Sequence, residues 1–154
     1  MASLAVYNIL SQYLAENWDS TRIVEVENAS IDLNNIEDVD DVQTEIKALV
    51  AVEYHMYSFS RPASIGAPLA NWERESGDIY IHVLAPAGTG TTELLGYAEE
   101  LKNLFLNKTI NGVWIRRCIP PVYQNEGSHT YTASRGNWFG FTIELQYQYD
   151  YIPS

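Results

Sequence analysis

"FTIELQYQYDY" (residues 141–151) alternates without a break between apolar or aromatic side chains and polar ones. Alternation over this length predicts a β-strand with one buried face, because successive side chains of a strand point to opposite faces of its sheet. We expect the strand to span residues 138–151, with its first apolar side chains under a helix and the tyrosines from Tyr147 onward extending beyond the core. The apolar side chains expected in the core are Phe141, Ile143 and Leu145.

Two other segments have the apolar spacing of amphipathic helices. Residues 3–17 form the first, and residues 91–107 form the second, in which Leu94, Ala98, Leu101 and Phe105 make the apolar stripe. Further strands are predicted at 21–28, 45–59, 78–86 and 112–119, the last of them stopped by Pro120-Pro121. Long loops are predicted at 29–44 and 60–77.

These elements predict an α+β fold in a single domain, residues 1–154. The simplest arrangement is one mixed, mostly antiparallel β-sheet with both helices packed on one face, plus long loops. The segment 78–119 is long enough for a crossover connection, which would make the strands 78–86 and 112–119 parallel.

The chain is acidic, and the acidity is uneven. Its net charge is −11. Residues 1–53 hold eleven acidic and two basic side chains, against nine and seven in residues 54–154. Binding of nucleic acid requires clustered Lys and Arg, so specific DNA binding is not expected. The N-terminal segment lacks the features of a signal peptide, and we expect a soluble protein made in a cytoplasm.

No pattern of residues defines an active site. The Gly88–Thr92 turn before the second helix lacks the lysine of a phosphate-binding loop, although a small ligand-binding module built on it is one alternative. His55 and His82 could pair across the sheet, but no third ligand has metal-like spacing. Cys118 with His55, His82 or His129 would be the catalytic pair of an enzyme, whereas an inert thiol is the commoner case. We therefore predict a non-enzyme with no cofactor, no metal and no catalytic residue.

Aromatic and basic residues are the candidates for contacts with partners. The loop after the second strand carries Arg61, Trp72 and Arg74, and Trp and Arg are typical interface anchors. Arg116 and Arg117 are adjacent in a predicted strand, which would place them on opposite faces.

The second half of the chain resembles the tail-terminator proteins of long-tailed bacteriophages. The strings that carry the likeness are "GDIYIHVLAPAGTGTTELLGYAEELKNLF", then "INGVWIRR", then "GNWFGFTIELQYQYDY". They mark a strand ending in Pro, Ala and Gly, a helix ending near Leu-Phe, a Gly-Val strand and a closing strand ending Tyr-Asp. The resemblance covers roughly residues 45–151, and residues 29–44 match nothing in the pattern.

The resemblance implies a structural virion protein of the tail and neck, assembled in the host cytoplasm. Such proteins form a ring, typically a hexamer, that caps the finished tail tube, stops its polymerisation and offers a docking surface for the head connector. The partners would be further copies of the chain, the tail tube protein and the connector, with DNA passing through the channel unbound and no membrane involved. A different neck component on the head side is the main alternative.

Two groups of residues are the candidate sites for this role. An acidic loop would repel phosphates if it lined the channel, and it comprises Glu37, Asp38, Asp40, Asp41 and Glu45. The face of the closing strand opposite its core face is polar but little charged, which suits a wet subunit interface or a channel wall. The candidate tube or subunit interface comprises Arg61, Trp72, Arg74, Arg116, Arg117, Gln146, Gln148, Tyr149 and Tyr151.

Overall fold

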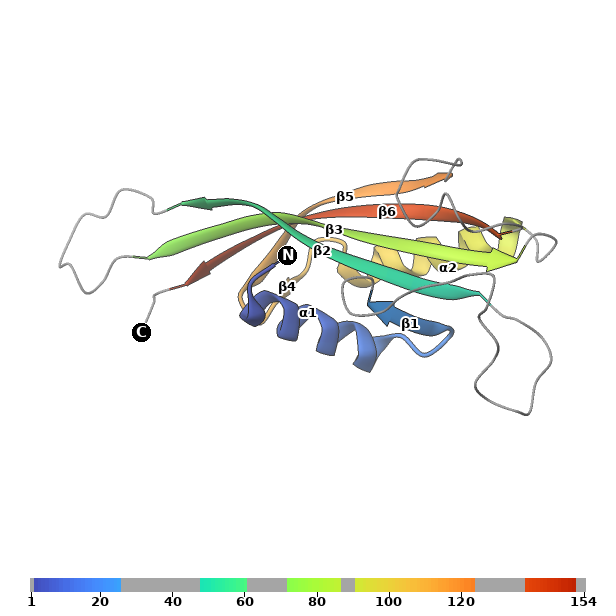
Figure 1. Ribbon diagram of the computed structural model, residues 1–154, viewed down its shortest axis with the longest axis horizontal. Helices are drawn as coiled ribbons and strands as arrows, with labels where there is room; N and C mark the ends of the chain where they lie inside the picture. Colours follow the sequence, from blue (N-terminus) through green and yellow to red (C-terminus); the bar gives the residue numbers. More distant parts are fainter. Residues whose placement is uncertain (1, 26–47, 61–71, 87–90, 124–137, 152–154) are drawn as a thin grey trace.

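A computed structural model of the chain describes residues 2–25, 48–60, 72–86, 91–123 and 138–151. Within them, two helices cover one side of a six-stranded sheet (Figure 1). This confirms the predicted α+β fold with a single mixed, mostly antiparallel sheet. The acidic loop residues from Glu37 to Glu45, together with Arg61 and His129, lie outside the described residues.

The two helices lie close to their predicted positions. α1 spans Leu4–Asn17, and the Ser3 hydroxyl caps it by accepting a hydrogen bond from the Val6 amide. α2 spans Thr91–Phe105, with Glu93 in its first turn and Lys102 in its last. Each of these charges interacts favourably with the helix dipole at its end of the helix. Neither of these helices is long and apolar enough to cross a membrane.

The strands run in the order β1-β2-β3-β6-β5-β4 across the sheet. β1 and β2 are parallel, and every other neighbouring pair is antiparallel. β3 and β5 therefore run in the same direction, as predicted, but β6 lies between them and pairs with both. The strand bounds are Arg22–Glu25 for β1, Leu49–Ser60 for β2, Glu73–Pro86 for β3, Thr109–Ile110 for β4, Val113–Tyr123 for β5 and Trp138–Tyr151 for β6.

The core lies between the sheet and the two helices. Tyr13 of α1 meets Phe105 of α2 edge-on, at 5.3 Å between ring centroids, so the helices also pack on each other. Burying each large apolar side chain contributes roughly 1.5 to 3 kcal/mol. The buried cluster joins α1, α2 and one row from each long strand, and it includes Val6, Leu10, Leu14, Leu94, Ala98, Leu101, Phe105, Val50, Val52, Ile79, Ile81, Ile115, Phe141, Ile143 and Leu145.

β3 begins at Glu73, five residues before the predicted start, so Gly77 is a strand residue and not part of a turn. A side chain at this position would meet the carbonyl oxygen of His55 and the ring of Tyr147, within 2.0 and 2.6 Å of its Cβ. The glycine lets the Tyr147 ring lie across β3. The Tyr147 hydroxyl donates a hydrogen bond to Glu75 at 3.3 Å.

Tyr147 is fully buried, although the sequence predicts that it extends beyond the core. Its burial and the nearby Glu75 carboxylate raise the pKa of its hydroxyl. The buried Glu75 carboxylate also accepts hydrogen bonds from the Ser3 amide and hydroxyl, at 2.7 and 2.6 Å. The start of α1 is thus tied to β3, which extends the core further along β6 than the apolar residues alone predict.

β5 continues through Pro120-Pro121 to Tyr123, whereas the sequence predicts a stop before them. The pairing with β6 shifts register between Ile119 and Val122, so the two prolines lie in an irregularity of the ladder. Proline lacks the amide hydrogen that a regular ladder needs, and a bulge is one of the places where a sheet tolerates it.

We predict that Leu145→Asp prevents folding. Leu145 is completely buried in the core, and an unpaired charge there costs more than about 4 kcal/mol. Circular dichroism should show no cooperative thermal transition. Leu4→Asp is the matched control, since Leu4 is 74% exposed, and it should change stability by less than about 0.5 kcal/mol. A soluble Leu145→Asp protein with a normal melting transition would contradict the core assignment.

Candidate interaction surface

The sheet face opposite the helices, here called the outer face, carries most of the charged and polar side chains of the long strands. Neighbouring strands bring these side chains together in rows: Arg117, Gln146 and Asp78 form one row across β5, β6 and β3. The outer face comprises Glu53, His55, Arg74, Ser76, Asp78, Tyr80, His82, Trp114, Arg116, Arg117, Thr142, Glu144, Gln146, Gln148 and Asp150.

A buried hydrogen-bonded chain occupies the middle of the outer face. The fully buried His82 has its Nε2 at 2.6 Å from Glu53 Oε2 and its Nδ1 at 2.6 Å from Thr142 Oγ1. A carboxylate can only accept, so Nε2 donates to Glu53. In the neutral imidazole Nδ1 then accepts from the Thr142 hydroxyl. Hydroxyl, imidazole and carboxylate are the groups of a hydrolase triad. Here Thr142 is only 7% exposed, and the three side chains come from β2, β3 and β6, so this hydrogen-bond network joins three strands.

His55 and His82 do not pair with each other. Both approach Glu53, at 3.8 Å for His55 and 2.6 Å for His82, and the Tyr80 ring lies between them. The contact between the two histidines that the sequence allows is therefore not formed. Cross-strand pairing explains this, because His55 lies opposite Asp78 and His82 lies opposite Ala51.

Two carboxylates on the outer face have raised pKa values. Burial raises the pKa of Asp78, while His55 acts against the rise. Burial and the nearby Asp78 raise the pKa of Glu144, and Arg117 acts against that rise. One carboxylate oxygen of Asp78, Oδ1, is buried and has no hydrogen-bond partner in the described structure. A buried acceptor without a partner is unfavourable for the charged carboxylate, in the same direction as the raised pKa of Asp78.

Arg116 and Arg117 lie on the same face, which corrects the prediction that they point to opposite faces. Register shifts between Ile115 and Arg117, so Arg116 is the extra residue of a bulge. Arg117 then pairs with Gln146, and the Arg116 guanidinium lies over the Trp114 ring, 5.8 Å from its centroid. Sequence periodicity could not reveal this, since a bulge interrupts the alternation that the prediction assumes.

The remaining predicted interface residues divide between the two faces. On the outer face, Arg74 forms a bidentate ion pair with Asp150, at 2.8 and 3.1 Å. Its guanidinium carbon lies over the Trp72 ring, 4.8 Å from the ring centroid. Gln148 donates to the same carboxylate at 3.1 Å. These contacts hold the pKa of Asp150 below its usual value.

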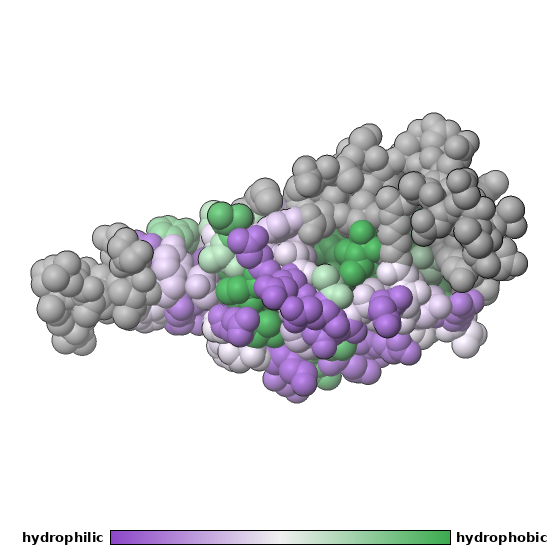
Figure 2. All heavy atoms as spheres, turned by 90° about the horizontal axis from the view of Figure 1, so that it is seen from below, coloured by the Kyte–Doolittle hydropathy of each residue, from purple (hydrophilic) through white to green (hydrophobic). Residues whose placement is uncertain are grey.

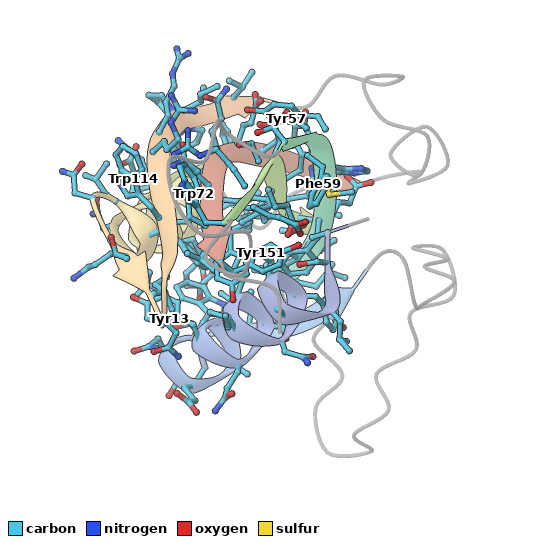
Figure 3. All side chains as sticks on the ribbon, turned by 90° about the vertical axis from the view of Figure 1, so that its left-hand side faces the viewer. Tyr13, Tyr57, Phe59, Trp72, Trp114 and Tyr151 are labelled. Atoms are coloured by element: carbon cyan, nitrogen blue, oxygen red, sulfur yellow. The ribbon has the colours of Figure 1, made fainter. Side chains whose placement is uncertain are left out.

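Tyr149 and Tyr151 lie on the helix side of β6, where their rings stack at 5.2 Å between centroids. Both are half-buried, and Tyr149 packs against the core cluster. Figure 3 looks at this end of the molecule and shows Tyr151 on the side of α1, with Trp114 on β5 and Phe59 on β2. The predicted set is therefore not one continuous patch.

Exposed large apolar and aromatic residues that sequence periodicity does not indicate lie on β2. Met56, Tyr57 and Phe59 are 42%, 58% and 54% exposed. They belong to the end of the sheet where β2, β3 and β6 extend beyond both helices (Figure 1). A register shift beside Tyr57 interrupts the ladder there. The alternation of the sequence could not reveal the exposure of these side chains, because their exposure depends on where the helices end.

Cys118 and the described histidines lie on different sides of the sheet. The half-buried thiol packs against the core cluster near Lys102, whereas His55 and His82 lie on the outer face. Burial raises the pKa of the Cys118 thiol, which makes the reactive thiolate less available. A Cys118–His55 or Cys118–His82 catalytic pair does not form.

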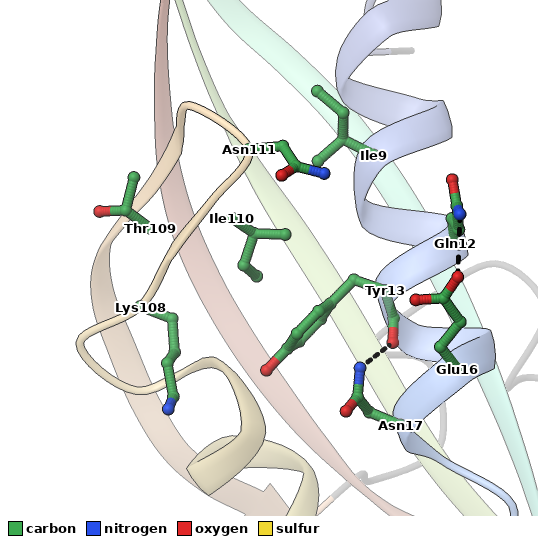
Figure 4. Close-up of a pocket in the computed structure, with 9 residues that line it drawn as sticks. All are labelled: Ile9, Gln12, Tyr13, Glu16, Asn17, Lys108, Thr109, Ile110 and Asn111. Carbon is green, nitrogen blue, oxygen red and sulfur yellow. Dashed lines mark hydrogen bonds between the residues drawn. The ribbon is translucent and has the colours of Figure 1, made fainter.

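A polar hollow of about 470 Å³ lies between α1 and the turn at residues 108–111 (Figure 4). In it Gln12 donates to Glu16 and Asn17 donates to the Tyr13 carbonyl, each at 2.8 Å. Figure 2, which views the molecule from this side, shows that hydrophilic side chains cover much of the surface. The hollow depends on the packing of α1 against β4, so no sequence motif predicted it. Its lining residues are Ile9, Gln12, Tyr13, Glu16, Asn17, Lys108, Thr109, Ile110 and Asn111.

Comparison with known proteins establishes the fold and nothing finer. No family model matches the chain, and no curated protein matches it. Twenty solved chains match. One of them, a protein whose name describes no function, aligns with a TM-score of 0.54 and 16% sequence identity, over 97% of this chain and 94% of its own. The likeness extends over nearly the whole of both chains and supports a single α+β architecture.

We predict that Thr142→Val lowers the free energy of unfolding by about 1–3 kcal/mol. The substitution keeps the shape of the side chain but leaves His82 Nδ1 buried without its partner. Urea unfolding measures the change. Thr142→Ser retains the hydroxyl and should recover most of the loss. Equal stability of Thr142→Val and the natural protein would show that this hydrogen bond contributes nothing.

The two raised carboxyl pKa values predict a pH dependence. The folded state binds the protons of Asp78 and Glu144 more tightly than the unfolded chain, so their favourable contribution is complete below the ordinary carboxyl pKa of about 4 and is lost as the pH rises through the raised values. Asp78→Asn should therefore raise the melting temperature more at about pH 7 than at about pH 3.5.

Asp150→Asn is the matched control with the opposite sign. The pKa of Asp150 is lowered by Arg74, so its contribution is present above the ordinary carboxyl pKa and is lost as the pH falls. Asp150→Asn should lower the melting temperature at neutral pH and change it less in acid. Shifts of the same sign for both variants at neutral pH would contradict this account.

Proposed function

We propose that this chain is a structural virion protein that caps the tail tube of a long-tailed phage as a ring, a hexamer as is typical of the proteins it resembles. The ring stops tube polymerisation and forms the docking surface for the head connector around the DNA channel. The observation that carries the proposal is the likeness of the pattern of elements in roughly residues 45–151 to tail-terminator proteins.

The two-sided sheet supports an assembly role. One face is closed by helices over an apolar core, while the other carries Trp and Arg side chains in contact with each other, as Trp114 with Arg116 and Trp72 with Arg74. Such pairs are typical anchors of protein interfaces. The exposed aromatic end of β2 offers a second surface, and a closed ring requires two different surfaces on each subunit.

Charge also suits a ring around DNA. A net charge of −11 keeps the chain from holding phosphates as the genome passes. The acidic loop from Glu37 to Glu45 remains the candidate lining of the channel. An enzyme remains the lower-ranked alternative, and among its candidate pairs the one of Cys118 with His129 is left, since Cys118 does not meet the other two histidines.

We predict that the purified protein shortens tail tubes. Tail tube protein should be polymerised with and without an equimolar amount of this chain, and tube lengths measured in negative-stain images. Capping predicts short tubes with a ring at one end. Leu145→Asp, as an unfolded control, should leave the lengths unchanged.

Long, uncapped tubes in the presence of the folded protein would contradict the proposal. Binding to the portal end of filled heads instead of to tubes would favour the alternative of a neck component on the head side.

A further inference from the structure

The strand register places complementary side chains at equal distances on either side of β6. In one row Arg117 of β5 and Asp78 of β3 flank Gln146 of β6. In the next row Trp114 and Ser76 flank Gln148. Adjacent strands are about 4.8 Å apart, so β3 and β5 are equally far from β6.

This arrangement is self-complementary. When two outer faces meet about a two-fold axis parallel to β6, the rotation exchanges β3 and β5. Each arginine of the flanking row then meets an aspartate, and the large, 48% exposed Trp114 meets the small Ser76. The same surface patch is used by both copies, as in most symmetric dimers.

We propose that the outer face binds a second copy of this chain in this way, with Arg117 of each copy against Asp78 of the other. The two sheets would pack face to face in the aligned manner of β-sandwiches, about 10 Å apart. This dimer goes beyond the proposed function: it is a state of the free protein in solution, before the protein binds a tail.

Charge complementarity identifies a second copy as the occupant. Arg117 and Asp78 lie on the two strands that flank the axis, so each flanking row brings an arginine of one copy against an aspartate of the other. Glu144 lies on β6 and would face its own copy, so the complementarity rests on the two Arg117–Asp78 pairs, which act against the overall repulsion of two chains of net charge −11. The half-buried Asp78 carboxylate would gain a guanidinium donor.

A charge exchange tests the proposal. Sedimentation equilibrium should show that the natural protein dimerises, and that Arg117→Asp and Asp78→Arg each weaken the dimer by about 30-fold or more, because like charges replace both ion pairs. An equimolar mixture of the two variants should dimerise again, since each interface then joins opposite charges. Lys108→Asp changes the net charge as Arg117→Asp does but lies beside the hollow on the helix side, and it should leave the dimer unchanged.

Cross-linking gives a second measurement that does not depend on the folding of Asp78→Arg. Gln146 lies next to the proposed axis and would face its own copy in the partner. In a Cys118→Ala background, Gln146→Cys should be joined efficiently to a second chain by a short bis-maleimide, and Gln12→Cys on α1 should not.

A monomeric natural protein would overturn this inference, as would a mixture of the two charge variants that stays monomeric or equal cross-linking at both positions. A natural protein that is monomeric in solution yet still caps tubes would overturn the inference while leaving the proposed function in place.

Discussion

The structure depends on the pairing of β6 with strands on both of its sides. Its apolar row, from Phe141 to Tyr147, is buried against the helices, and its polar row faces away from them. Because side chains on a strand alternate strictly, a shift of one residue in this pairing would exchange the two rows and expose the core. The register of β6 therefore determines both which side chains form the core and which side chains lie on the outer face.

Buried polar groups stabilise this register at two places. Glu75 accepts hydrogen bonds from Ser3 and Tyr147, which joins β3 to α1 and β6. On the other face His82 joins Glu53 to Thr142 across three strands. Each group would be costly without its partner, so these contacts favour one register over its alternatives more than they add to total stability.

The sequence predicts the elements that follow a regular period and misses the features that interrupt one. Alternation in 141–151 and the apolar stripe of the second helix were sufficient for the fold class, since each has one buried side. The bulge at Arg116 and the strand glycine at Gly77 depend on neighbouring strands, so the shared face of the two arginines and the early start of β3 were not predicted. The network of His82 joins residues from three strands and has no local signal.

The central claim is that this chain stands at the end of a phage tail. Cryo-electron microscopy of mature tails carrying an epitope-tagged copy, labelled with the matching antibody fragment, tests it most directly. Our account predicts a single ring of label at the head-proximal end of each tail. Label along the tube, at the distal tip or absent from purified tails would contradict it.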